Sequence, residues 1–363
     1  MNKIVMLLPN LAGGGAERVN LDLAYEFKSK GYQVDIVLCN AKGDFLQEAA
    51  DNFHITDLQL KSIIQLPFKL TQYINSENPD AIIVSMWGLT AFAPFIKLLS
   101  KNTPSILLVE HNSLINQFKS SRLSIRIFLR ISTFISYRLA DHIGGVSLGV
   151  TNDMRKLACI KKNSAIEVLY NPIPSKTSIK INSQKIDFWE GCDHKILNVG
   201  SFKEQKNQKL LIEAFYLIKD KIDAKLIILG QGKLEQELKD LVNELDLESR
   251  VCFPGFIESP EQYFQNADLF VLSSDREGFG NVIVESLSCG TPVVSTNCEH
   301  GPSEILKQGE FGYLVPVGDS VALSEAILKS LTSEHDKNKL INRSKDFLPE
   351  KAAKRYLDLL GFE

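Results

Sequence analysis

Two glutamates, Glu277 and Glu285, are separated by seven residues in a segment that also contains Gly278 and Gly280. The segment follows the apolar run 269–272, which is predicted to be a strand. Parallel sheets bind ligands at the carboxyl ends of their strands, and glycine lets backbone amides approach a phosphate without a Cβ in the way. The pattern predicts that Glu277 accepts hydrogen bonds from sugar hydroxyls and that Glu285, about one turn into the following helix, binds a ribose diol. In the alternative interpretation, both are solvated surface acids.

Two other features could contact a ligand. His111 follows the apolar run 105–109 and so comes at the carboxyl end of a predicted strand, although an isolated histidine fits a structural role equally well. The consecutive glycines Gly13–Gly15 precede a predicted helix. They form either a tight turn or a point where a ligand approaches the backbone closely.

No acidic residue occurs from residue 111 to 140, whereas Arg122, Arg126 and Arg130 recur there at a spacing that predicts one shared helical face. Apolar residues lie between these arginines. Basic amphipathic helices lie on anionic membrane surfaces, and arginine binds diphosphates through paired hydrogen bonds. Two interpretations stay open for the segment Lys119–Arg138: it is an acceptor or membrane site, or its apolar face is core and its arginines are solvated.

The first half of the chain alternates predicted strands and helices. A strand at 3–8, the glycine turn, a helix that ends near Gly31 and a strand at 34–38 form a βαβ unit. More apolar strands are predicted at 81–85, 105–109, 142–147 and 166–169. A parallel, doubly wound sheet explains this alternation.

The second half repeats the same alternation after a predicted linker. The segment Tyr170–Ser175 contains two prolines and leads into polar residues up to Asp187. Beyond it, strands are predicted at 195–199, 226–229, 251–253, 269–272 and 292–295, and helices at 208–219 and 234–245. We expect an α/β protein with two Rossmann-like, doubly wound domains at 1–172 and 173–345. A C-terminal helix within 346–363 is expected to pack back toward the N-terminal domain.

Length and composition narrow the class of protein. With 363 residues, 44% of them hydrophobic and 23% charged, the chain resembles a soluble globular protein of about two domains. No apolar run approaches the roughly 18 residues of a membrane-spanning helix, and the six cysteines form no Cys-x-x-Cys pair. We therefore expect a cytoplasmic protein, peripheral at the inner face of the cell membrane, without metal or cofactor and without a nucleic-acid partner.

Charge is distributed unequally along the chain. Residues 1–174 contain 18 Lys and Arg against 14 Asp and Glu, a net charge of +4, whereas the remainder contains 23 against 30, a net charge of −7. Such asymmetry indicates an anionic partner for the first half only.

The segment from Glu277 to Glu285, followed by Gly290–Val294, resembles the donor-site signature of the family 4 retaining glycosyltransferases, which have the GT-B fold. Four more stretches resemble this family: Gly13–Arg18, Glu110–Asn112, Gly200 with Lys206–Asn207, and Gly301–Glu304. The resemblance spans both predicted domains. It implies that they face each other across a cleft, with a nucleotide-sugar bound by the second domain and the acceptor by the first.

The resemblance also implies roles for single residues. Glu277 and His111 are the implied catalytic residues, His111 through contact with the transferred sugar near its 6-hydroxyl and not as a general base. Lys206 is implied to neutralise the donor diphosphate. Ser201 stands where the family usually has Arg, and Lys203 is a candidate replacement for that cation. The implied donor-binding residues are Gly14, Gly15, Gly200, Ser201, Lys206, Gly278, Phe279, Gly280, Asn281, Val282 and Glu285.

The implied reaction is transfer of a hexose or N-acetylhexosamine from a nucleotide-sugar, with UDP as the expected nucleotide, to a glycan acceptor in bacterial surface polysaccharide or glycan biosynthesis. Bacterial relatives that extend lipid-linked glycans have a comparable basic segment. The expected acceptor is therefore linked to polyprenyl diphosphate, with Lys119, Arg122, Arg126 and Arg130 near it or near the membrane.

Two other functions compete with this one. A non-catalytic subunit that binds a nucleotide-sugar would keep the same fold, and the Ser201 departure is compatible with it. An NAD-dependent oxidoreductase would explain the N-terminal strand, glycine loop and helix. It fits less well because Arg18 replaces the third glycine and the second strand ends in Cys39-Asn40 without an acid for the ribose.

Overall fold

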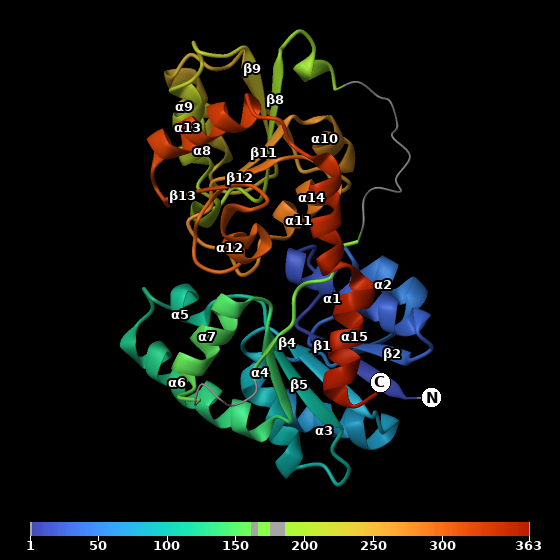
Figure 1. The fold of residues 1–363 in the computed structure, drawn as a ribbon. Helices are drawn as coiled ribbons and strands as arrows, with labels where there is room; N and C mark the ends of the chain where they lie inside the picture. The colour runs from blue at the N-terminus through green and yellow to red at the C-terminus, as the bar shows by residue number, and fades with distance from the viewer. Residues whose placement is uncertain (1, 161–165, 175–185, 363) are drawn as a thin grey trace. The chain divides into compact units, whose positions relative to one another are not determined.

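A computed structural model of the protein describes residues 2–160, 166–174 and 186–362. The chain divides into two compact units (Figure 1). Unit 1 comprises Met1–Pro174 together with Phe347–Glu363, and unit 2 comprises Ser175–Asp346. Most of the predicted linker, residues 175–185, lies outside the described residues.

The core of unit 1 is a seven-stranded parallel sheet with the strand order β3-β2-β1-β4-β5-β6-β7. Sheets that helices cover on both faces need strands that are apolar on both sides, and all six residues of β1 are buried. In the register of the sheet, Ile4 lies beside Val34 on one side and Ala81 on the other. The strands are β1 (Lys3–Leu8), β2 (Gln33–Leu38), β3 (His54–Asp57), β4 (Ala81–Ser85), β5 (Ser105–Glu110), β6 (His142–Gly145) and β7 (Glu167–Val168).

Helices connect the strands of unit 1, and the C-terminal helix joins them. The rings of Phe27 in α1 and Tyr356 in α15 pack with their centroids 6.3 Å apart, and both side chains are fully buried. Helix α15 therefore covers α1 within unit 1, as Figure 1 shows. The α-helices of unit 1 are α1 (Gly15–Ser29), α2 (Leu46–Asn52), α3 (Leu66–Glu77), α4 (Leu89–Phe92), α5 (Leu114–Gln117), α6 (Leu123–Leu139), α7 (Leu148–Leu157) and α15 (Pro349–Leu360).

Unit 2 is built around a six-stranded parallel sheet with the order β10-β9-β8-β11-β12-β13. Strand β8 pairs with β9 along its whole length and with β11 on its other side, where Ile196 lies beside Leu269. The strands are β8 (His194–Val199), β9 (Ala224–Leu229), β10 (Val251–Gly255), β11 (Leu269–Leu272), β12 (Val293–Thr296) and β13 (Tyr313–Val315).

Helices cover both faces of the unit 2 sheet. Figure 1 shows α8, α9 and α13 on one side and α10, α11 and α14 on the other. Apolar side chains of the first group pack with the sheet in one buried cluster that includes Phe215, Leu238 and Ile327. The α-helices are α8 (Gln208–Tyr216), α9 (Glu235–Glu244), α10 (Glu261–Asn266), α11 (Asn281–Ser288), α12 (Pro302–Ile305), α13 (Ser320–Leu331) and α14 (Lys337–Ser344).

Each sheet reverses its strand order once, between β1 and β4 in unit 1 and between β8 and β11 in unit 2. The loops that leave such a pair at the carboxyl ends run in opposite directions and leave room for a ligand. The doubly wound parallel sheets predicted from the sequence are confirmed in both units. The edge strands β3 and β13 were not predicted.

Candidate functional site

In unit 2, the two loops that leave the strand reversal bring together residues 71 positions apart. The loop after β8 carries Lys206 at the end of a short 3-10 turn (Glu204–Lys206), and the loop after β11 carries Glu277. Lys206 Nζ lies 2.7 Å from Glu277 Oε1. The two side chains are only 21% and 8% exposed. The residues predicted to bind the diphosphate and the sugar of one ligand therefore form a nearly buried ion pair.

The Glu277 carboxylate is held from a second direction. The hydroxyl of Ser274, which is fully buried, donates a hydrogen bond of 2.7 Å to Glu277 Oε1. Both contacts thus converge on one carboxylate oxygen, and the other, Oε2, has no hydrogen-bond partner within the described part of the chain. An oriented carboxylate with one oxygen available suits a sugar hydroxyl as hydrogen-bond donor.

Other hydrogen bonds join the two loops to each other. Asn207, which has a left-handed φ of 44°, donates to Asp275 Oδ1 at 2.8 Å and caps helix α8 as the residue just before it. Ser273 Oγ donates to the carbonyl oxygen of Lys206 at 3.0 Å, and the Asp275 amide donates to Gln205 O at 2.9 Å. The position of Lys206 relative to Glu277 is therefore fixed by hydrogen bonds between the two loops.

Glycines bring the chain into α11 and pack the next loop against it. Gly280, with φ 102°, immediately precedes the first residue of α11. Gly301 also has φ 102°, and a Cβ there would lie 1.7 Å from the carbonyl oxygen of Phe279. The predicted donor residues Gly278 and Phe279 are buried in this loop, and three more lie half-buried on α11: Asn281, Val282 and Glu285.

The loop after β8 contains the remaining donor candidates of unit 2. Gly200 and Ser201 are half-buried, and the buried Gln208 side chain donates to the Ser201 carbonyl oxygen at 3.3 Å. Lys203, the candidate replacement for the missing arginine, has an exposed side chain in the same loop.

In unit 1, His111 directly follows β5 and lies beside a polar network from the strand reversal. Its Nε2 is 3.5 Å from the side-chain amide nitrogen of Asn20 in α1, and Ser85 at the end of β4 donates to Asn20 Oδ1 at 2.9 Å. An amide donor at Nε2 leaves the ring hydrogen on Nδ1, which has no partner among the described residues. Burial lowers the pKa of His111 to about 4. The imidazole is therefore neutral near pH 7 and able to donate to a ligand.

Glu110, which precedes His111, is fully buried and has two hydroxyl partners. Thr90 Oγ1 donates to Glu110 Oε1 at 2.6 Å, and the Tyr137 hydroxyl of α6 donates to the same oxygen at 3.1 Å. Desolvation by burial raises the pKa of Glu110 to about 7, although these two hydrogen bonds act in the opposite direction. Neither Glu110 nor its two partners was predicted as a functional residue on its own.

The glycines Gly14 and Gly15 lie at the beginning of α1, after β1, and both are exposed. Gly13 has φ 85°, a conformation that residues with a side chain rarely adopt. The turn therefore needs glycine at position 13. The two predicted donor residues follow it, on the unit that does not contain Lys206 and Glu277.

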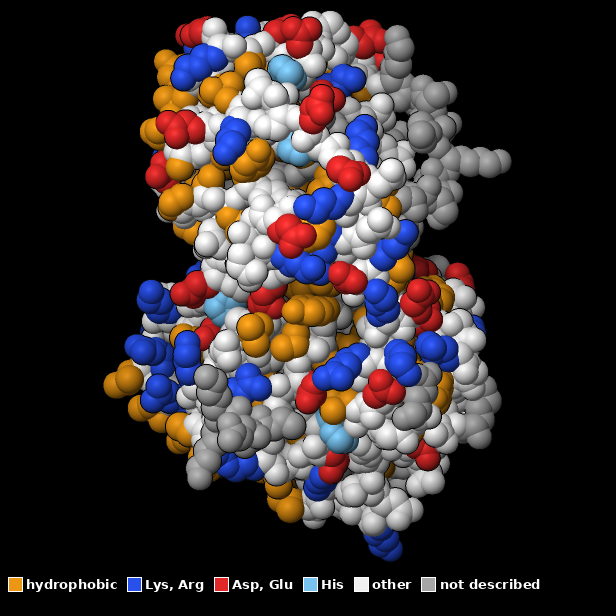
Figure 2. All heavy atoms as spheres, in the orientation of Figure 1, with side chains coloured by type: hydrophobic (Ala, Val, Ile, Leu, Met, Phe, Trp, Pro, Cys, Tyr) orange, Lys and Arg blue, Asp and Glu red, His pale blue; other side chains and the backbone are white. Residues whose placement is uncertain are grey.

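Helix α6 has the reverse of the usual distribution of polar and apolar residues. Its buried residues include Ser132, Thr133 and Ser136, whereas Leu123 is 69% exposed and Ile131 is 55% exposed. The other exposed apolar residues of the helix are Ile125, Ile127, Phe128, Phe134 and Ile135. The interpretation that this apolar face is core is therefore wrong. Figure 2 shows apolar and basic side chains together along the edge of unit 1 where α6 lies.

The structure corrects one detail of the predicted basic helix. Arg122 is extended, with φ −54° and ψ 147°, and immediately precedes the first residue of α6, so it does not share a helical face with Arg126 and Arg130. The two serines before Arg122 favour a turn because their hydroxyls compete for backbone hydrogen bonds. Lys119 lies in that turn, after α5. All four basic side chains are nevertheless exposed.

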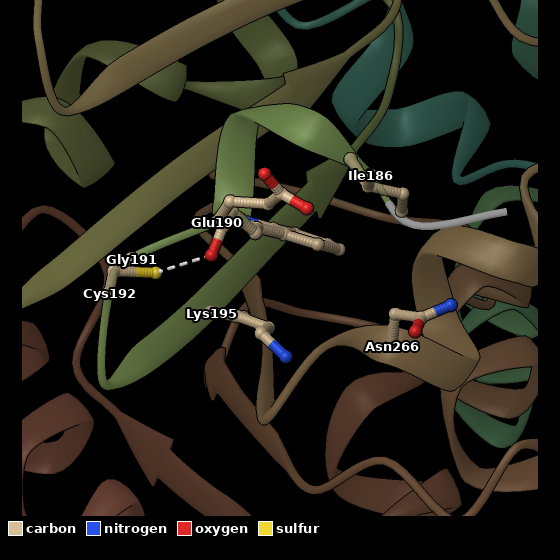
Figure 3. A pocket seen from close by; sticks show the side chains of 7 residues that line it. Ile186, Glu190, Gly191, Cys192, Lys195 and Asn266 are labelled. Carbon is tan, nitrogen blue, oxygen red and sulfur yellow. Dashed lines mark hydrogen bonds between the residues drawn. The ribbon is translucent and has the colours of Figure 1, made fainter.

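A cavity of about 490 Å³ lies in unit 2 near the amino-terminal end of β8 (Figure 3). Its lining includes Lys195, near the beginning of β8, and Asn266, at the end of α10 just before β11. Doubly wound sheets bind ligands at the carboxyl ends of their strands, and Lys206 and Glu277 follow those ends. We therefore do not assign the donor site to this cavity.

Within the described residues, no helix combines the length and the apolar content needed to cross a bilayer. The same residues contain no group of three or more His, Cys, Asp and Glu side chains able to bind a metal ion.

Comparisons with known proteins cover both units. The family described as "Glycosyltransferase Family 4" matches residues 13–176, and the family "Glycosyl transferases group 1" matches residues 180–347. The chain is 30% identical to N-acetylgalactosamine-N,N'-diacetylbacillosaminyl-diphospho-undecaprenol 4-alpha-N-acetylgalactosaminyltransferase of Campylobacter jejuni, over 99% of this chain and 100% of that protein.

Another relative and a solved structure extend the comparison. N-acetyl-alpha-D-glucosaminyl L-malate synthase of Bacillus anthracis is 25% identical over 96% of this chain and 93% of that protein. The crystal structure of Anabaena Alr3699/HepE in complex with UDP superposes with a TM-score of 0.82 at 20% identity, over 99% of this chain and all of that chain. The two parallel-sheet units and this likeness establish the GT-B fold. Together with the full-length match to the Campylobacter enzyme, they show that the chain belongs to the family 4 glycosyltransferases.

Proposed function

We propose that this protein is a retaining glycosyltransferase that transfers a hexose or N-acetylhexosamine from a UDP-sugar to a polyprenyl-diphosphate-linked glycan at a membrane surface. Unit 2 binds the donor, and unit 1 binds the acceptor. The observation that carries the proposal is the meeting of Lys206 and Glu277 at the strand reversal of unit 2. A cation beside an oriented carboxylate matches a ligand with a diphosphate next to a sugar.

In the proposed donor complex, Lys206 binds the diphosphate and Glu277 accepts hydrogen bonds from hydroxyls of the transferred sugar. Glu285, one turn into α11, binds the ribose diol. A fixed ammonium group stabilises the negative charge that develops on the leaving nucleoside diphosphate. The crystal structure of Anabaena Alr3699/HepE with bound UDP supports UDP as the nucleotide.

We propose that the acceptor hydroxyl attacks the anomeric carbon from the face that the diphosphate leaves. The new glycosidic C–O bond forms as the bond to the phosphate oxygen breaks, and the hydroxyl proton passes to that phosphate oxygen. The anomeric configuration is then retained. His111, neutral at pH 7 and with Nδ1 unpartnered among the described residues, donates a hydrogen bond to the transferred sugar.

Helix α6 supports a lipid-linked acceptor over a soluble one. Its exposed side chains combine Leu123, Ile127 and Phe134 with Arg126 and Arg130, which suits an interface between lipid and water. The relative from Campylobacter is named for a diphospho-undecaprenol-linked acceptor, and the one from Bacillus anthracis for L-malate. A small polar acceptor such as malate does not require an exposed apolar face, so we propose an acceptor linked to polyprenyl diphosphate.

A donor screen tests this function. Purified protein is incubated with single nucleotide-sugars and with polyprenyl-diphosphate-linked glycans in anionic vesicles, and release of nucleoside diphosphate is measured. We expect acceptor-dependent release of UDP and, by NMR of the product, the anomeric configuration of the donor sugar. An inverted product would disprove the retaining mechanism. Binding of UDP-sugars without transfer or hydrolysis would favour the non-catalytic binding subunit.

A further inference from the structure

Glu110 is a buried acid for which the reaction proposed above has no use. It is the last residue of β5 and only 1% exposed. Burial raises its pKa and the hydrogen bonds from its two hydroxyl partners lower it, with no contribution from a charged neighbour. Such a carboxyl is costly to bury, and removal of one partner leaves it unsatisfied. Its position directly before His111 suggests a reason for keeping it.

Glu110 and His111 point to opposite faces of the sheet, as neighbours in a strand do. Glu110 contacts Thr90 of α4 and Tyr137 of α6, whereas His111 contacts Asn20 of α1. The end of β5 is thus held on one face by Glu110 and presents His111 on the other.

The Thr90 contact ties a strained loop to the same carboxylate. Thr90 is fully buried, and its amide donates to the carbonyl oxygen of Met86, which has φ 75° directly after β4. A positive φ at a residue with a long side chain persists only where the surroundings enforce it, and such residues gather at functional sites. The Met86 amide in turn donates to Val109 O at 3.2 Å, beside Glu110.

The Tyr137 contact connects Glu110 to α6. Two inward hydroxyls of α6, those of Ser132 and Thr133, donate to the Leu129 carbonyl oxygen within the helix, and the buried Ser136 hydroxyl has no hydrogen-bond partner among the described residues. The hydrogen bond from Tyr137 to Glu110 links a side chain of α6 to a side chain of β5 within the described residues. The opposite side of α6 is the exposed apolar and basic face.

We propose that Glu110 is a positioning residue that couples α6 to His111 through Tyr137, so that docking of α6 on a membrane surface orders the turn that carries His111. This inference rests on the proposed function, because it requires α6 to engage the membrane. Glu110 contacts no reacting atom in this scheme. It acts through the backbone of the residue that follows it.

Hydrogen exchange tests the coupling without an activity assay. Binding to vesicles of phosphatidylcholine with phosphatidylglycerol is first measured by sedimentation. Exchange is then followed by mass spectrometry in peptides that span residues 110–117. In the parent protein, we expect vesicles to slow exchange there by about fivefold or more, which is the low end of typical coupling between sites.

Two pairs of variants give the matched comparison. Tyr137→Phe removes only the hydroxyl that reaches Glu110, whereas Tyr73→Phe removes an equally buried tyrosine–carboxylate bond, 2.8 Å to Asp35, elsewhere in unit 1. We expect Tyr137→Phe to bind vesicles without slowing exchange at the turn, and Tyr73→Phe to behave like the parent. Glu110→Gln keeps an acceptor oxygen and the coupling, whereas Glu110→Leu loses it.

The outcomes separate this inference from the function on which it rests. If the parent protein does not bind the vesicles, membrane attachment and the coupling both fall. If it binds but exchange at residues 110–117 is unchanged, the coupling alone is wrong. If vesicles slow exchange at residues 110–117 equally in Tyr137→Phe and in the parent, the coupling is also wrong, because the Tyr137 hydroxyl would then not be needed for it.

Discussion

The ion pair between Lys206 and Glu277 affects how the proposed donor binds. The Glu277 carboxylate forms an ion pair with Lys206, the residue that we propose binds the diphosphate. A diphosphate must therefore share Lys206 with Glu277 or displace it. The two residues then have opposite effects on nucleotide affinity, although both are needed for transfer.

Substitution of the pair should separate binding from transfer. Lys206→Ala removes a charge-assisted hydrogen bond, so we expect UDP affinity to fall by roughly tenfold to a hundredfold in calorimetry. Glu277→Gln removes the competing charge and should bind UDP as tightly as the parent or more tightly. The same variant should raise the barrier to transfer by roughly 3 kcal/mol, because one transition-state contact is lost.

Lys209→Ala, in the same region but with an exposed side chain on α8, is the matched control and should leave UDP affinity unchanged. Undiminished UDP binding by Lys206→Ala would contradict the assignment of Lys206 to the diphosphate. Near-parental transfer by folded Glu277→Gln would falsify the proposed role of Glu277.

The buried Glu110 should make the stability of unit 1 depend on pH. The pKa of Glu110 is about 7 in the folded protein, against an ordinary value of 4.5, so the folded state keeps a proton that the unfolded chain has lost. Stability therefore falls as the pH rises through this window. Between pH 5 and 7, the free energy of unfolding of the parent should fall relative to that of Glu110→Gln by about 2 kcal/mol.

Tryptophan fluorescence can report this change for unit 1 alone. The chain has two tryptophans, Trp87 in unit 1 and Trp189 in unit 2, so a Trp189→Phe background leaves one reporter in unit 1. The pKa of His111, lowered to about 4 by burial, changes stability with pH in the opposite direction, with stability lost as the pH falls from 6.5 to 4. This contribution is the same in the parent and in Glu110→Gln, so it cancels in the comparison. A difference that does not vary with pH would show that Glu110 titrates near its ordinary value.

The sequence indicated Lys206 and Glu277, which the structure brings together, but it did not indicate the residues that hold them. Glu277 and Lys206 could be found because their types and their places after apolar strands carry a chemical meaning. Ser274 and Thr90 could not, since an isolated hydroxyl residue gives no sign of the carboxylate it contacts in the folded chain. Only the fold shows that Ser274 and Lys206 share one oxygen of Glu277.

At the scale of elements, α6 is unusual because it is held to unit 1 by few apolar side chains. Leu129 packs with Leu114 and Leu157, and the tyrosine contact with Glu110 lies on the same inward side. Arg138 donates to the carbonyl oxygens of Ala158 and Cys159 after α7, so its guanidinium is already bound. Arg122, Arg126 and Arg130 are the better candidates to meet an anionic surface.

Replacement of these three arginines by glutamine should weaken binding to anionic vesicles by roughly a hundredfold at low salt, since each basic residue near such a surface contributes about 1 kcal/mol. High salt should reduce the difference through screening. Hydrolysis of the donor should stay almost unchanged because Lys206 and Glu277 lie in unit 2. Sedimentation of vesicles and release of UDP provide the two measurements.

The control is a variant that loses the same number of positive charges at positions away from α6. Glutamine at Lys28, Lys30 and Lys61, three exposed lysines of unit 1, removes as many charges away from α6. Equal loss of vesicle binding in both variants would show that only net charge matters. If the arginine variant binds vesicles as well as the parent at low salt, the membrane assignment of α6 is wrong.

Most elements could be predicted, and the exceptions share a physical cause. The central strands are buried on both faces and appear as continuous apolar runs, so periodicity finds them. Strand β3 has four residues, none of them fully buried, and β13 has three, so neither gives a usable pattern. The sequence left two interpretations open for the apolar face of α6, because its spacing is equally compatible with an exposed and with a buried apolar side.

At the scale of the whole molecule, charge follows the division into units. Residues 347–363, which join unit 1, contain three basic and three acidic residues, so unit 1 keeps the net charge of +4 and unit 2 that of −7. This supports an anionic partner for unit 1. Membership of the family 4 glycosyltransferases excludes the oxidoreductase alternative, which had rested on the strand, glycine loop and helix of unit 1.

Unit 1 should depend for its stability on a helix that follows unit 2 in the sequence. Tyr356→Ala removes a fully buried ring that packs on Phe27, so we expect the free energy of unfolding of unit 1 to fall by about 3–5 kcal/mol. Denaturant curves of Trp189→Phe and Trp87→Phe backgrounds report units 1 and 2 separately. A loss confined to unit 2 would contradict the packing of α15 on α1.

The return of α15 to unit 1 also has a consequence for protein synthesis. Residues 175–346 must be translated before α15 leaves the ribosome, which takes roughly 10–35 s at about 5–20 residues per second. Throughout that time the nascent unit 1 exposes the apolar face of α1 that Tyr356 later covers. Unit 2, which is continuous in the sequence, can finish folding first. A chain released before residue 349 would therefore contain a complete unit 2 and a unit 1 whose exposed apolar surface chaperones and proteases can bind.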